Sequence, residues 1–219
     1  MGEIIRLKAA DGHALDAYLA NPTGLARGGI VIMQEIFGLT GHIRRIVDQY
    51  ANQGFLTIAP SLFDRIEPGI VLDYADVEKG RELMMTLERD GLVADMTAAV
   101  AAARAAGKVA AIGYCWGGAM ADLAACRAGV DAAVSYYGRA TVGWLDEQPR
   151  CPVLYHYGAE DPLIPPELIE QISAGRPGQQ SYIYEAAGHG FNCDERDDYR
   201  PESAALALAR TLDFLEDNL

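Results

Sequence analysis

The hydrophobic positions of the chain alternate between short, almost wholly apolar runs and longer stretches with helical spacing. Runs of about four to eight apolar residues between turn residues are typical of buried strands, whereas apolar residues three and four apart indicate helices. The runs that predict strands are 29–33, 56–60, 109–113, 132–136, 153–157 and 181–184. The stretches that predict helices are 42–53, 77–106 with a break near 90–91, 117–126 and 202–216. This alternation favours an α/β fold with a mostly parallel sheet and helices on both faces.

The beginning of the chain predicts an antiparallel hairpin. Residues 4–9 and 14–20 form its strands, and Asp11 and Gly12 form the turn between them. No internal repeat, low-complexity tract or linker interrupts the pattern, and 219 residues suit one sizeable α/β domain. We therefore expect a single domain over residues 1–219.

Composition and charge narrow the range of partners. Half of the residues are hydrophobic, which is enough for a buried core, and 18 basic residues face 31 acidic ones for a net charge of −13. Such a surface repels nucleic-acid phosphates and anionic lipid headgroups. We expect neither nucleic acid nor a membrane as a partner, and an anionic substrate would need a local positive anchor.

The start of the chain and its cysteines predict a cytoplasmic location. We find no signal peptide, and no stretch approaches the roughly 20 apolar residues of a membrane span. Free thiols suit a reducing compartment, and the cysteines lack a CxxC pair or regular spacing. They are Cys115, Cys126, Cys151 and Cys193.

The segment 113–118, Gly-Tyr-Cys-Trp-Gly-Gly, carries the first candidate for chemistry. It has the Gly-x-Ser-x-Gly form of a nucleophile elbow, a sharp turn between a strand and a helix, with Cys115 in place of serine. The positive end of the following helix favours a thiolate, and the N–H of Trp116 would face a developing oxyanion. The alternative is a buried core cysteine, which is how we interpret Cys126 and Cys151, whereas Cys193 stays unassigned.

A nucleophilic cysteine needs a base, and the chain has four histidines. His13 falls in the hairpin turn, His42 begins a predicted surface helix, and His156 lies inside an apolar strand as a core residue. His189 stands in the glycine-flanked loop before the last helix. Because such a loop can hold an imidazole over the carboxyl edge of the sheet, we predict that His189 is the base.

The acid that orients this histidine should lie between the two in the sequence, since hydrolases with this elbow order their residues as nucleophile, acid and histidine. The loop after strand 153–157 offers Glu160 and Asp161. We predict Asp161, which lies one step further into the loop and is fixed by Pro162. The alternative is an exposed turn acid.

The loop Gln34 to Gly38 follows another predicted strand. A loop at this position supplies the second oxyanion N–H, here from Ile36. Glu35 would then point towards Cys115, and a buried carboxylate beside a thiol can share a proton with it. The alternative is a purely structural loop.

Taken together, these motifs resemble the dienelactone hydrolase (carboxymethylenebutenolidase) family of the α/β-hydrolase superfamily, nearly from end to end of the chain. The segments that carry the resemblance are 34–38, 113–118, Gly158 with 161–162, and 188–191, supported by 136–138 and 211–215. The resemblance implies a triad of Cys115, His189 and Asp161, with no metal and no organic cofactor. It also implies that Glu35 holds the resting thiol and helps to free the thiolate when substrate binds. The implied reaction opens an ester or lactone through an acyl-cysteine intermediate.

The substrate contacts differ from the family pattern. Family members bind a substrate carboxylate with arginines, one of them four residues after the catalytic histidine, where this chain has Cys193. The other arginine falls near Gly80, so we expect Arg81 to take its role, and a neutral or differently anchored ester is the alternative to dienelactone as substrate. The further residues expected to contact the substrate are Phe37, Tyr137 and Phe191.

Three functions compete at this point. The first is a cysteine hydrolase of small esters or lactones, working as a monomer or small homo-oligomer. The second is a thiol redox sensor that uses Cys115, with Cys193 as its resolving partner. The third is a non-catalytic binding module on the same fold. No dinucleotide, phosphate-loop, HExxH or EF-hand motif is present, so we expect no cofactor.

Overall fold

One sheet of eight strands forms the centre of the computed structural model, which describes residues 1–219. The strands are β1 Glu3–Lys8, β2 Ala14–Ala20, β3 Gly29–Met33, β4 Leu56–Pro60, β5 Val109–Tyr114, β6 Ala132–Tyr136, β7 Val153–Gly158 and β8 Gln180–Tyr184. Their order across the sheet is β1-β2-β4-β3-β5-β6-β7-β8. The β1–β2 and β2–β4 pairs are antiparallel, and all other pairs are parallel.

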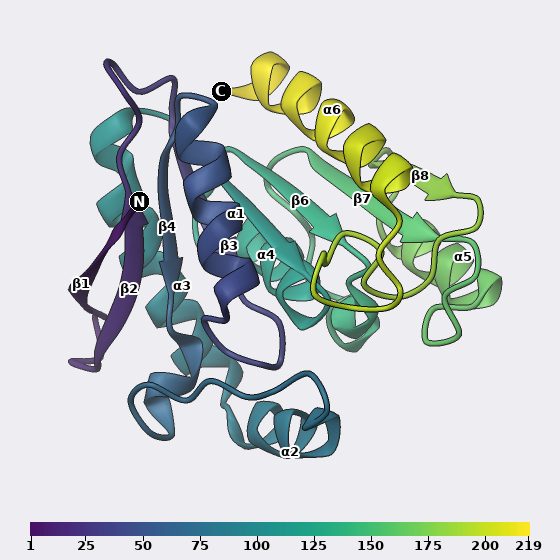
Figure 1. Ribbon diagram of the computed structural model, residues 1–219, viewed down its shortest axis with the longest axis horizontal. Helices are drawn as coiled ribbons and strands as arrows, with labels where there is room; N and C mark the ends of the chain where they lie inside the picture. The colour runs from purple at the N-terminus through teal and green to yellow at the C-terminus, as the bar shows by residue number, and fades with distance from the viewer.

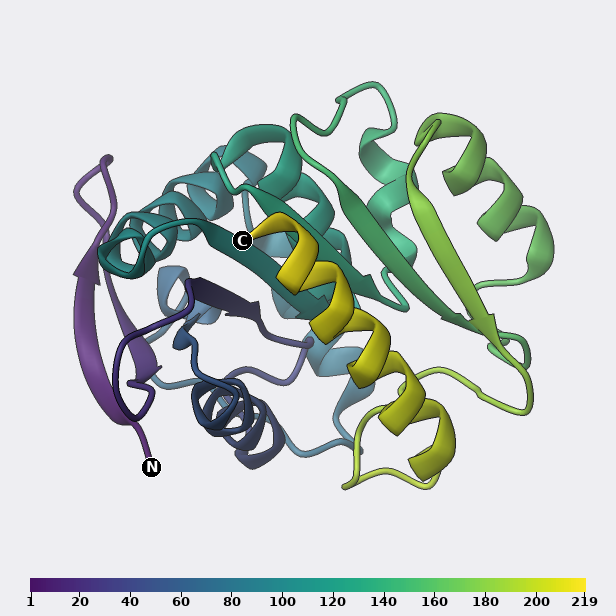
Figure 2. The same cartoon turned by 90° about the horizontal axis from the view of Figure 1, so that it is seen from above.

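Helices cover both faces of this sheet. The α-helices are α1 Gly41–Asn52, α2 Val77–Thr86, α3 Arg89–Ala103, α4 Trp116–Arg127, α5 Pro166–Gly175 and α6 Pro201–Asn218. Short 3-10 helices add η1 Leu62–Arg65, η2 Arg104–Ala106 and η3 Arg139–Trp144. Helices α1 and α6 lie on one face, and α3, α4 and α5 lie on the other (Figures 1 and 2). Helix α2 lies beyond the carboxyl ends of the strands (Figure 1).

The central strands are wholly buried because both of their faces are covered. Every residue of β3, β4, β5, β6 and β7 is buried, whereas β1 and β8 at the two edges are partly exposed. Strands buried on both faces carry continuous apolar runs instead of alternating patterns. The predicted α/β class, the parallel sheet and the N-terminal hairpin are therefore confirmed.

The break in the predicted helix 77–106 lies earlier in the chain than expected. Helix α2 ends at Thr86 and α3 begins at Arg89, so residues 90–91 fall within the first turn of α3. An acidic residue is favourable there because of the helix dipole. Gly91 leaves room for a side chain from η1, since a Cβ at this position would lie 3.0 Å from the Arg65 guanidinium.

Helix α5 is missing from the elements that the sequence pattern predicts. It has ten residues, and its buried residues are Ile169 and Ile172. Two buried positions do not establish a helical period. The signal that marks it is Pro166 at the first helical position, where proline is favoured.

Candidate active site

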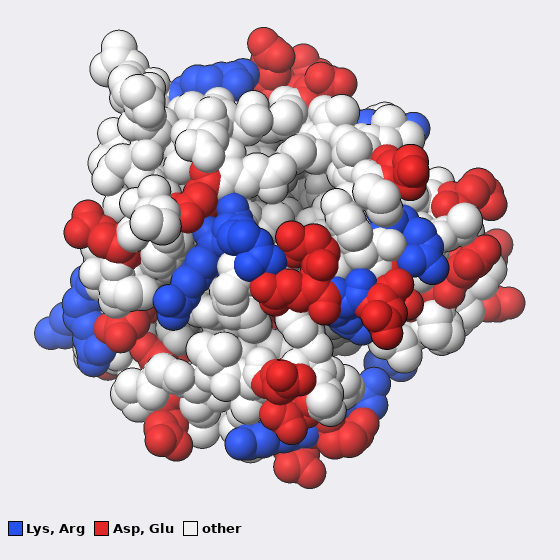
Figure 3. Space-filling view, in the orientation of Figure 1, with Lys and Arg blue, Asp and Glu red and all other residues white.

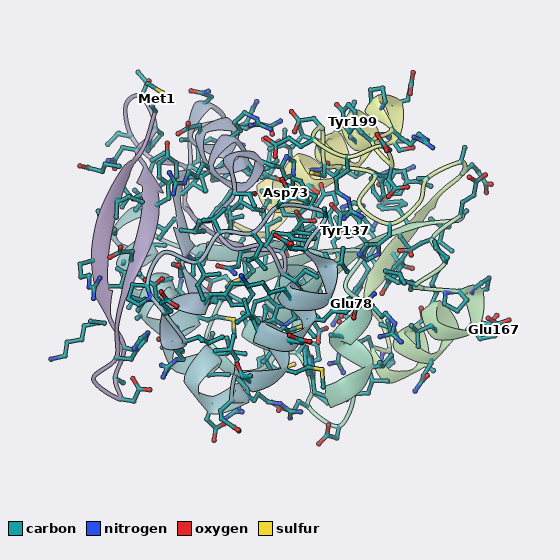
Figure 4. The ribbon with its side chains drawn as sticks, turned by 60° about the horizontal axis from the view of Figure 1, so that its bottom comes forward. Met1, Asp73, Glu78, Tyr137, Glu167 and Tyr199 are labelled. Carbon is teal, nitrogen blue, oxygen red and sulfur yellow. The ribbon has the colours of Figure 1, made fainter.

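A cavity of about 790 Å³ opens at the carboxyl edge of the sheet. It lies between the segment after β3, helix α2, the start of α4 and the segment that leads into α5. Figure 4 looks towards this edge, with Tyr137 near the middle of the view and Glu167 of α5 at its periphery. Parallel α/β sheets place their ligand sites outside the carboxyl ends of the strands. The cavity is therefore the first place to look for the predicted residues.

Cys115 lies in a sharp turn between β5 and α4. Its backbone has φ 56° and ψ −118°. Residues other than glycine rarely adopt this conformation, which costs about 1–3 kcal/mol. The neighbouring glycines permit the turn, because a Cβ on Gly113 would lie 1.8 Å from the Gly117 carbonyl oxygen. A Cβ on Gly117 would lie 2.2 Å from the Met33 carbonyl oxygen. This close packing brings the end of β3 against the turn that carries the thiol.

A hydrogen-bonded chain joins this thiol to the two other predicted residues. His189 Nε2 lies 3.0 Å from Cys115 Sγ, and Asp161 Oδ2 lies 2.8 Å from His189 Nδ1. The other carboxylate oxygen of Asp161 accepts the Leu163 N–H at 2.8 Å, which fixes its orientation. Asp161 and His189 are buried, whereas Glu160 is exposed. A carboxylate bound to Nδ1 holds the tautomer in which Nε2 faces the sulfur.

The loops of the acid and the histidine meet across a glycine. A Cβ on Gly158, at the end of β7, would lie 2.2 Å from the carbonyl oxygen of Ala187. The Glu160 N–H also donates to this carbonyl at 2.9 Å. These contacts hold the segment before His189 against the turn that carries Asp161.

The charges around His189 favour its protonated form. Burial alone would lower the pKa of this imidazole, but Cys115 and the Asp161 carboxylate raise it to about 10. The arrangement therefore favours an imidazolium next to the Cys115 sulfur, which is the partner that a thiolate nucleophile requires.

Glu35 lies beneath the cavity in a fully buried position. Both of its carboxyl oxygens are buried without a hydrogen-bond partner, and burial raises the pKa of this group. Cys115 contacts His189 instead of Glu35. The resting contact between thiol and carboxyl that the resemblance implies is therefore not present in this arrangement.

Two backbone amides are available beside the sulfur. Ile36 and Trp116 line the cavity together with Cys115. Trp116 is the first residue of α4, so its N–H has no acceptor within the helix. The Ile36 N–H donates no hydrogen bond to another protein atom. Free amides at this place can receive the oxygen of a polarised carbonyl group.

The remaining predicted contacts divide into two groups. Phe37 and Arg81 line the cavity. Tyr137 and Phe191 do not line it; they are fully buried behind His189. The ring centroid of Tyr137 lies 5.1 Å from that of His189, and the Phe191 ring lies 5.4 Å from Tyr137. In this arrangement they support the imidazole instead of forming the cavity wall.

Two cavity arginines were not among the predicted residues. Arg139 and Arg196 line the cavity with Arg81. Arg81 is half-exposed and pairs with Glu78 at 2.7 Å. Arg196 has a side chain 21% exposed, and a Cβ on Gly190, next to His189, would lie 3.0 Å from its guanidinium. The sequence signal for Arg196 is only its place in the same loop as His189.

The prediction that His42 lies on a surface helix is wrong. His42 lies in the first turn of α1, where the helix was predicted to start, but it is only 2% exposed instead of facing solvent, and its Nδ1 lies 2.9 Å from Asp194. The loop before α6 covers this end of the helix, which the periodicity of α1 does not reveal.

Of the residues predicted for the core, His156 and Cys126 are buried, whereas Cys151 is half-buried at the edge of the core. His156 binds Tyr184 and Thr211, and burial lowers its pKa to about 3, so the core prediction is confirmed. All four cysteines are free, and the buried Cys193 thiol contacts the Tyr74 hydroxyl at 3.4 Å.

Comparisons with known proteins agree with this geometry. The model of the dienelactone hydrolase family matches residues 15–219. The chain belongs to the dienelactone hydrolase family. It is 36% identical to a carboxymethylenebutenolidase of Pseudomonas putida over 225 residues, covering 97% of this chain and 95% of that protein. Carboxymethylenebutenolidase 1 of Cupriavidus pinatubonensis is 33% identical over 223 residues, with coverage of 96% and 95%.

Solved structures support the fold of this family member. A candidate dienelactone hydrolase from Klebsiella pneumoniae is 28% identical with a TM-score of 0.81, covering 96% of this chain and 97% of that one. The dienelactone hydrolase-like promiscuous phosphotriesterase P91 from metagenomic libraries, 22% identical, has a TM-score of 0.78, with coverage of 99% and 98%. The predicted family and the α/β-hydrolase fold are confirmed.

The structure lacks two kinds of feature, a membrane-spanning helix and a metal-binding cluster. None of its helices combines the length and apolar character that a membrane span requires. No group of three or more His, Cys, Asp or Glu side chains is arranged to hold a metal ion. The single domain, the cytoplasmic location and the monomeric or small oligomeric state stay predictions.

Proposed function

We propose that this dienelactone hydrolase family member hydrolyses small esters or lactones with Cys115 as its nucleophile. The observation that carries the proposal is the continuous hydrogen-bonded chain from Asp161 through His189 to a sulfur on a strained turn that borders a cavity. Nucleophile, base and orienting acid within hydrogen-bond reach are the signature of covalent catalysis.

The first half of the reaction forms an acyl-enzyme. The Cys115 thiolate attacks the substrate carbonyl carbon, and the carbonyl oxygen becomes an oxyanion bound by the N–H groups of Ile36 and Trp116. The bond to the leaving oxygen then breaks, and His189 donates its Nε2 proton to that oxygen. In a lactone the leaving oxygen stays attached to the acyl group, so the ring opens.

The second half releases the product. His189, now neutral, takes a proton from a water molecule, and the resulting hydroxide attacks the thioester carbonyl. The carbon–sulfur bond breaks, a carboxylic acid forms, and the thiolate returns beside the imidazolium. Asp161 keeps its negative charge throughout and stabilises the imidazolium in both halves.

Glu35 adjusts the ionisation of the nucleophile. A carboxylate close to a thiolate opposes it by like-charge repulsion, whereas a protonated carboxyl does not. Burial raises the pKa of Glu35, which favours the protonated form and so permits the thiolate. Glu35→Gln should keep this permissive state at every pH.

The lining of the cavity suits an ester substrate that has both an apolar part and a negatively charged group. Apolar side chains of α2 and α5, among them Val77, Met84 and Leu168, line it together with the arginines. A chain of net charge −13 that directs arginines into one cavity has a local anchor for an anion. Arg196 is the best placed of them, because it is largely buried beside the histidine loop and its pair with Asp198 is long at 3.6 Å, whereas Arg81 pairs with Glu78 at 2.7 Å.

The experiment that tests this function compares two cysteine variants on an activated aryl ester. Cys115→Ala should lower kcat/KM by at least about a thousandfold, because no other group replaces the nucleophile. Cys126→Ala, a matched substitution of a buried cysteine in α4, should stay close to the wild type. Equal activity of the two variants would remove Cys115 from the mechanism.

The redox-sensor hypothesis has no comparable support. Cys193 is fully buried, and its thiol contacts Tyr74 instead of Cys115.

A further inference from the structure

Arg196 reaches the substrate cavity from the loop before α6, and the protein leaves most of its charge unused. Its side chain is 21% exposed, and its one ion pair, with Asp198, is 3.6 Å long. That distance is longer than a hydrogen bond, and the Asp198 side chain is half-exposed. A guanidinium in this state can donate its N–H groups to an anion that enters the cavity.

Neighbouring charges of the same loop are matched at the protein surface. Arg45 of α1 pairs with Asp194 and with Glu195, each at 2.8 Å. Figure 3 shows basic and acidic side chains meeting near the middle of this face, over the loop before α6. Arg196 differs because it lines the cavity and has no such short pair. The contacts that hold its guanidinium in place therefore involve uncharged neighbours.

Two uncharged neighbours lie against the guanidinium of Arg196. Gly190, next to His189, leaves room for it, because a Cβ at this position would lie 3.0 Å from Arg196 Nη1. The other neighbour is Tyr74, whose ring centroid lies 6.0 Å from Arg196 Cζ. A guanidinium over an aromatic ring is attracted by the negative face of the ring, and the attraction grows where water is excluded. This contact holds the charge in place without occupying its hydrogen-bond donors.

Tyr74, in the turn before α2, is itself fixed by the loop after β3 and by the loop before α6. Its ring packs edge-on against the Phe37 ring, with 4.8 Å between the centroids. Its hydroxyl lies 3.4 Å from Oγ1 of Thr40, the N-cap of α1, and 3.4 Å from Cys193 Sγ. Contacts with three residues from separate places restrict the orientation of the ring.

The backbone before Tyr74 is joined to the loop after β3. The Leu72 N–H donates to the Phe37 carbonyl at 2.9 Å, and Val71 pairs with Gly38 in an isolated antiparallel bridge. Phe37 lines the cavity, whereas Tyr74 does not. Tyr74 therefore lies behind two residues of the cavity wall, Phe37 and Arg196, as a support that a substrate does not touch.

The other two cavity arginines have no such support. Arg81 pairs with Glu78 at 2.7 Å, and Arg139 donates its Nε–H to the Leu163 carbonyl at 3.0 Å. Neither of their guanidinium groups lies over an aromatic ring. Arg196 is thus the one arginine of the cavity whose position depends on an aromatic side chain.

We infer that Tyr74 is the positioning residue that holds Arg196 in the cavity and thereby sets the selectivity for substrates that carry a carboxylate. A guanidinium that is fixed before binding loses less conformational entropy when the anion arrives. The carboxylate accepts hydrogen bonds from N–H groups that no protein atom occupies at short range. The inference rests on the proposed function, in which Arg196 anchors the negative group of the substrate.

The test measures binding, so it does not depend on turnover. Phenylacetate, a carboxylate with an apolar ring, and its neutral counterpart phenylacetamide are titrated into the enzyme and followed by NMR. The ratio of their dissociation constants measures the preference for a negative charge. Arg196→Gln should remove most of this preference, and Tyr74→Leu should lower it about three- to tenfold, because the ring face is lost. Phenylacetamide should bind both variants as it binds the wild type, which shows that the cavity is still formed.

Two controls separate the ring from other effects. Tyr74→Phe keeps the ring and loses the hydroxyl, so the preference should stay within about twofold of the wild type. Tyr182→Leu is the matched control, because Tyr182 is a half-buried tyrosine of β8 whose ring centroid lies 3.8 Å from Arg210 Cζ, away from the cavity. It should leave the preference unchanged.

Three results would overturn the inference. The first is an unchanged preference in Arg196→Gln or in Tyr74→Leu. The second is an equal weakening of both ligands in Tyr74→Leu, which is what a purely structural role produces. The third is the full selective loss when Tyr74→Leu is added to Arg196→Gln, because the ring would then act without the guanidinium. A failure of Cys115 as the nucleophile would appear separately, in the hydrolytic activity of Cys115→Ala.

Discussion

The structure contains two buried histidines whose Nδ1 atoms face an aspartate, and their second nitrogens differ. His189 binds Asp161 at 2.8 Å and presents Nε2 to the Cys115 sulfur at 3.0 Å. His42 binds Asp194 at 2.9 Å and presents Nε2 to no partner. The same acid–imidazole unit thus faces a nucleophile in one place and leaves a buried, unused nitrogen in the other. What the unit does depends on the group that its second nitrogen faces.

Replacing the two histidines should give the largest difference in activity. His189→Gln should lower kcat/KM for an activated ester by about 10⁴-fold, because it removes both the thiolate partner and the proton donor. His42→Asn should change kcat/KM by less than about tenfold, since His42 contacts neither Cys115 nor the substrate cavity. Steady-state kinetics of both purified variants gives the two numbers. Similar losses in both would mean that the two histidines do not have separate roles.

The two aspartates sharpen the same comparison. Asp161→Asn should lower kcat by roughly a thousandfold, since an amide can hold the wrong tautomer of His189. Asp194→Asn should leave kcat within about tenfold across the pH range, because Asp194 contacts neither His189 nor the substrate cavity. Rate–pH profiles of both variants measure this difference. A large loss at neutral pH in Asp194→Asn would assign that residue to the catalytic centre.

The cavity arginines give an effect of intermediate size. Arg196→Gln should lower kcat/KM for an ester that carries a carboxylate by about 10- to 100-fold, with a neutral ester of the same shape hardly affected. Arg81→Gln is the control, because Arg81 already pairs with Glu78 and is half-exposed. If Arg81→Gln shows the selective loss and Arg196→Gln does not, the anchor is Arg81, as the sequence predicts.

The pH dependence of stability should give the smallest effect. The folded pKa of His189 is raised from 6.5 to about 10, so its contribution to the free energy of unfolding is fully present below pH 6.5. It is lost as the pH rises through about 10. Urea unfolding between these values should show this decline, and Cys115→Ala should move it to lower pH because the largest charge that raises the pKa is removed. A wild-type curve that is flat over this range would contradict the assigned charge state.

The sequence predicts those parts of the site that local motifs determine. The glycines around Cys115, the strand before it and the helix after it are close in sequence, so their geometry follows from the pattern alone. In the structure Asp161 is distinguished from Glu160 by its bonds to His189 Nδ1 and to the Leu163 N–H and by its burial.

The sequence could not predict the contacts that depend on the path of the loop before α6. This loop covers His42 with Asp194 and brings Arg196 to the cavity, although it has no period of its own. Tyr137 and Phe191 adjoin the predicted motifs, but their burial behind His189 depends on how β6 and this loop pack together.

The most direct test of the central claim is mass spectrometry of the enzyme quenched during turnover of a slowly deacylated aryl ester. The account predicts one added acyl group, located by peptide mapping on Cys115 and absent in Cys115→Ala. When His189→Gln is acylated with a highly activated ester, the adduct should persist, because the base that activates water is missing. An acyl group on another residue, or steady turnover without a covalent adduct under conditions in which deacylation limits the rate, would contradict it.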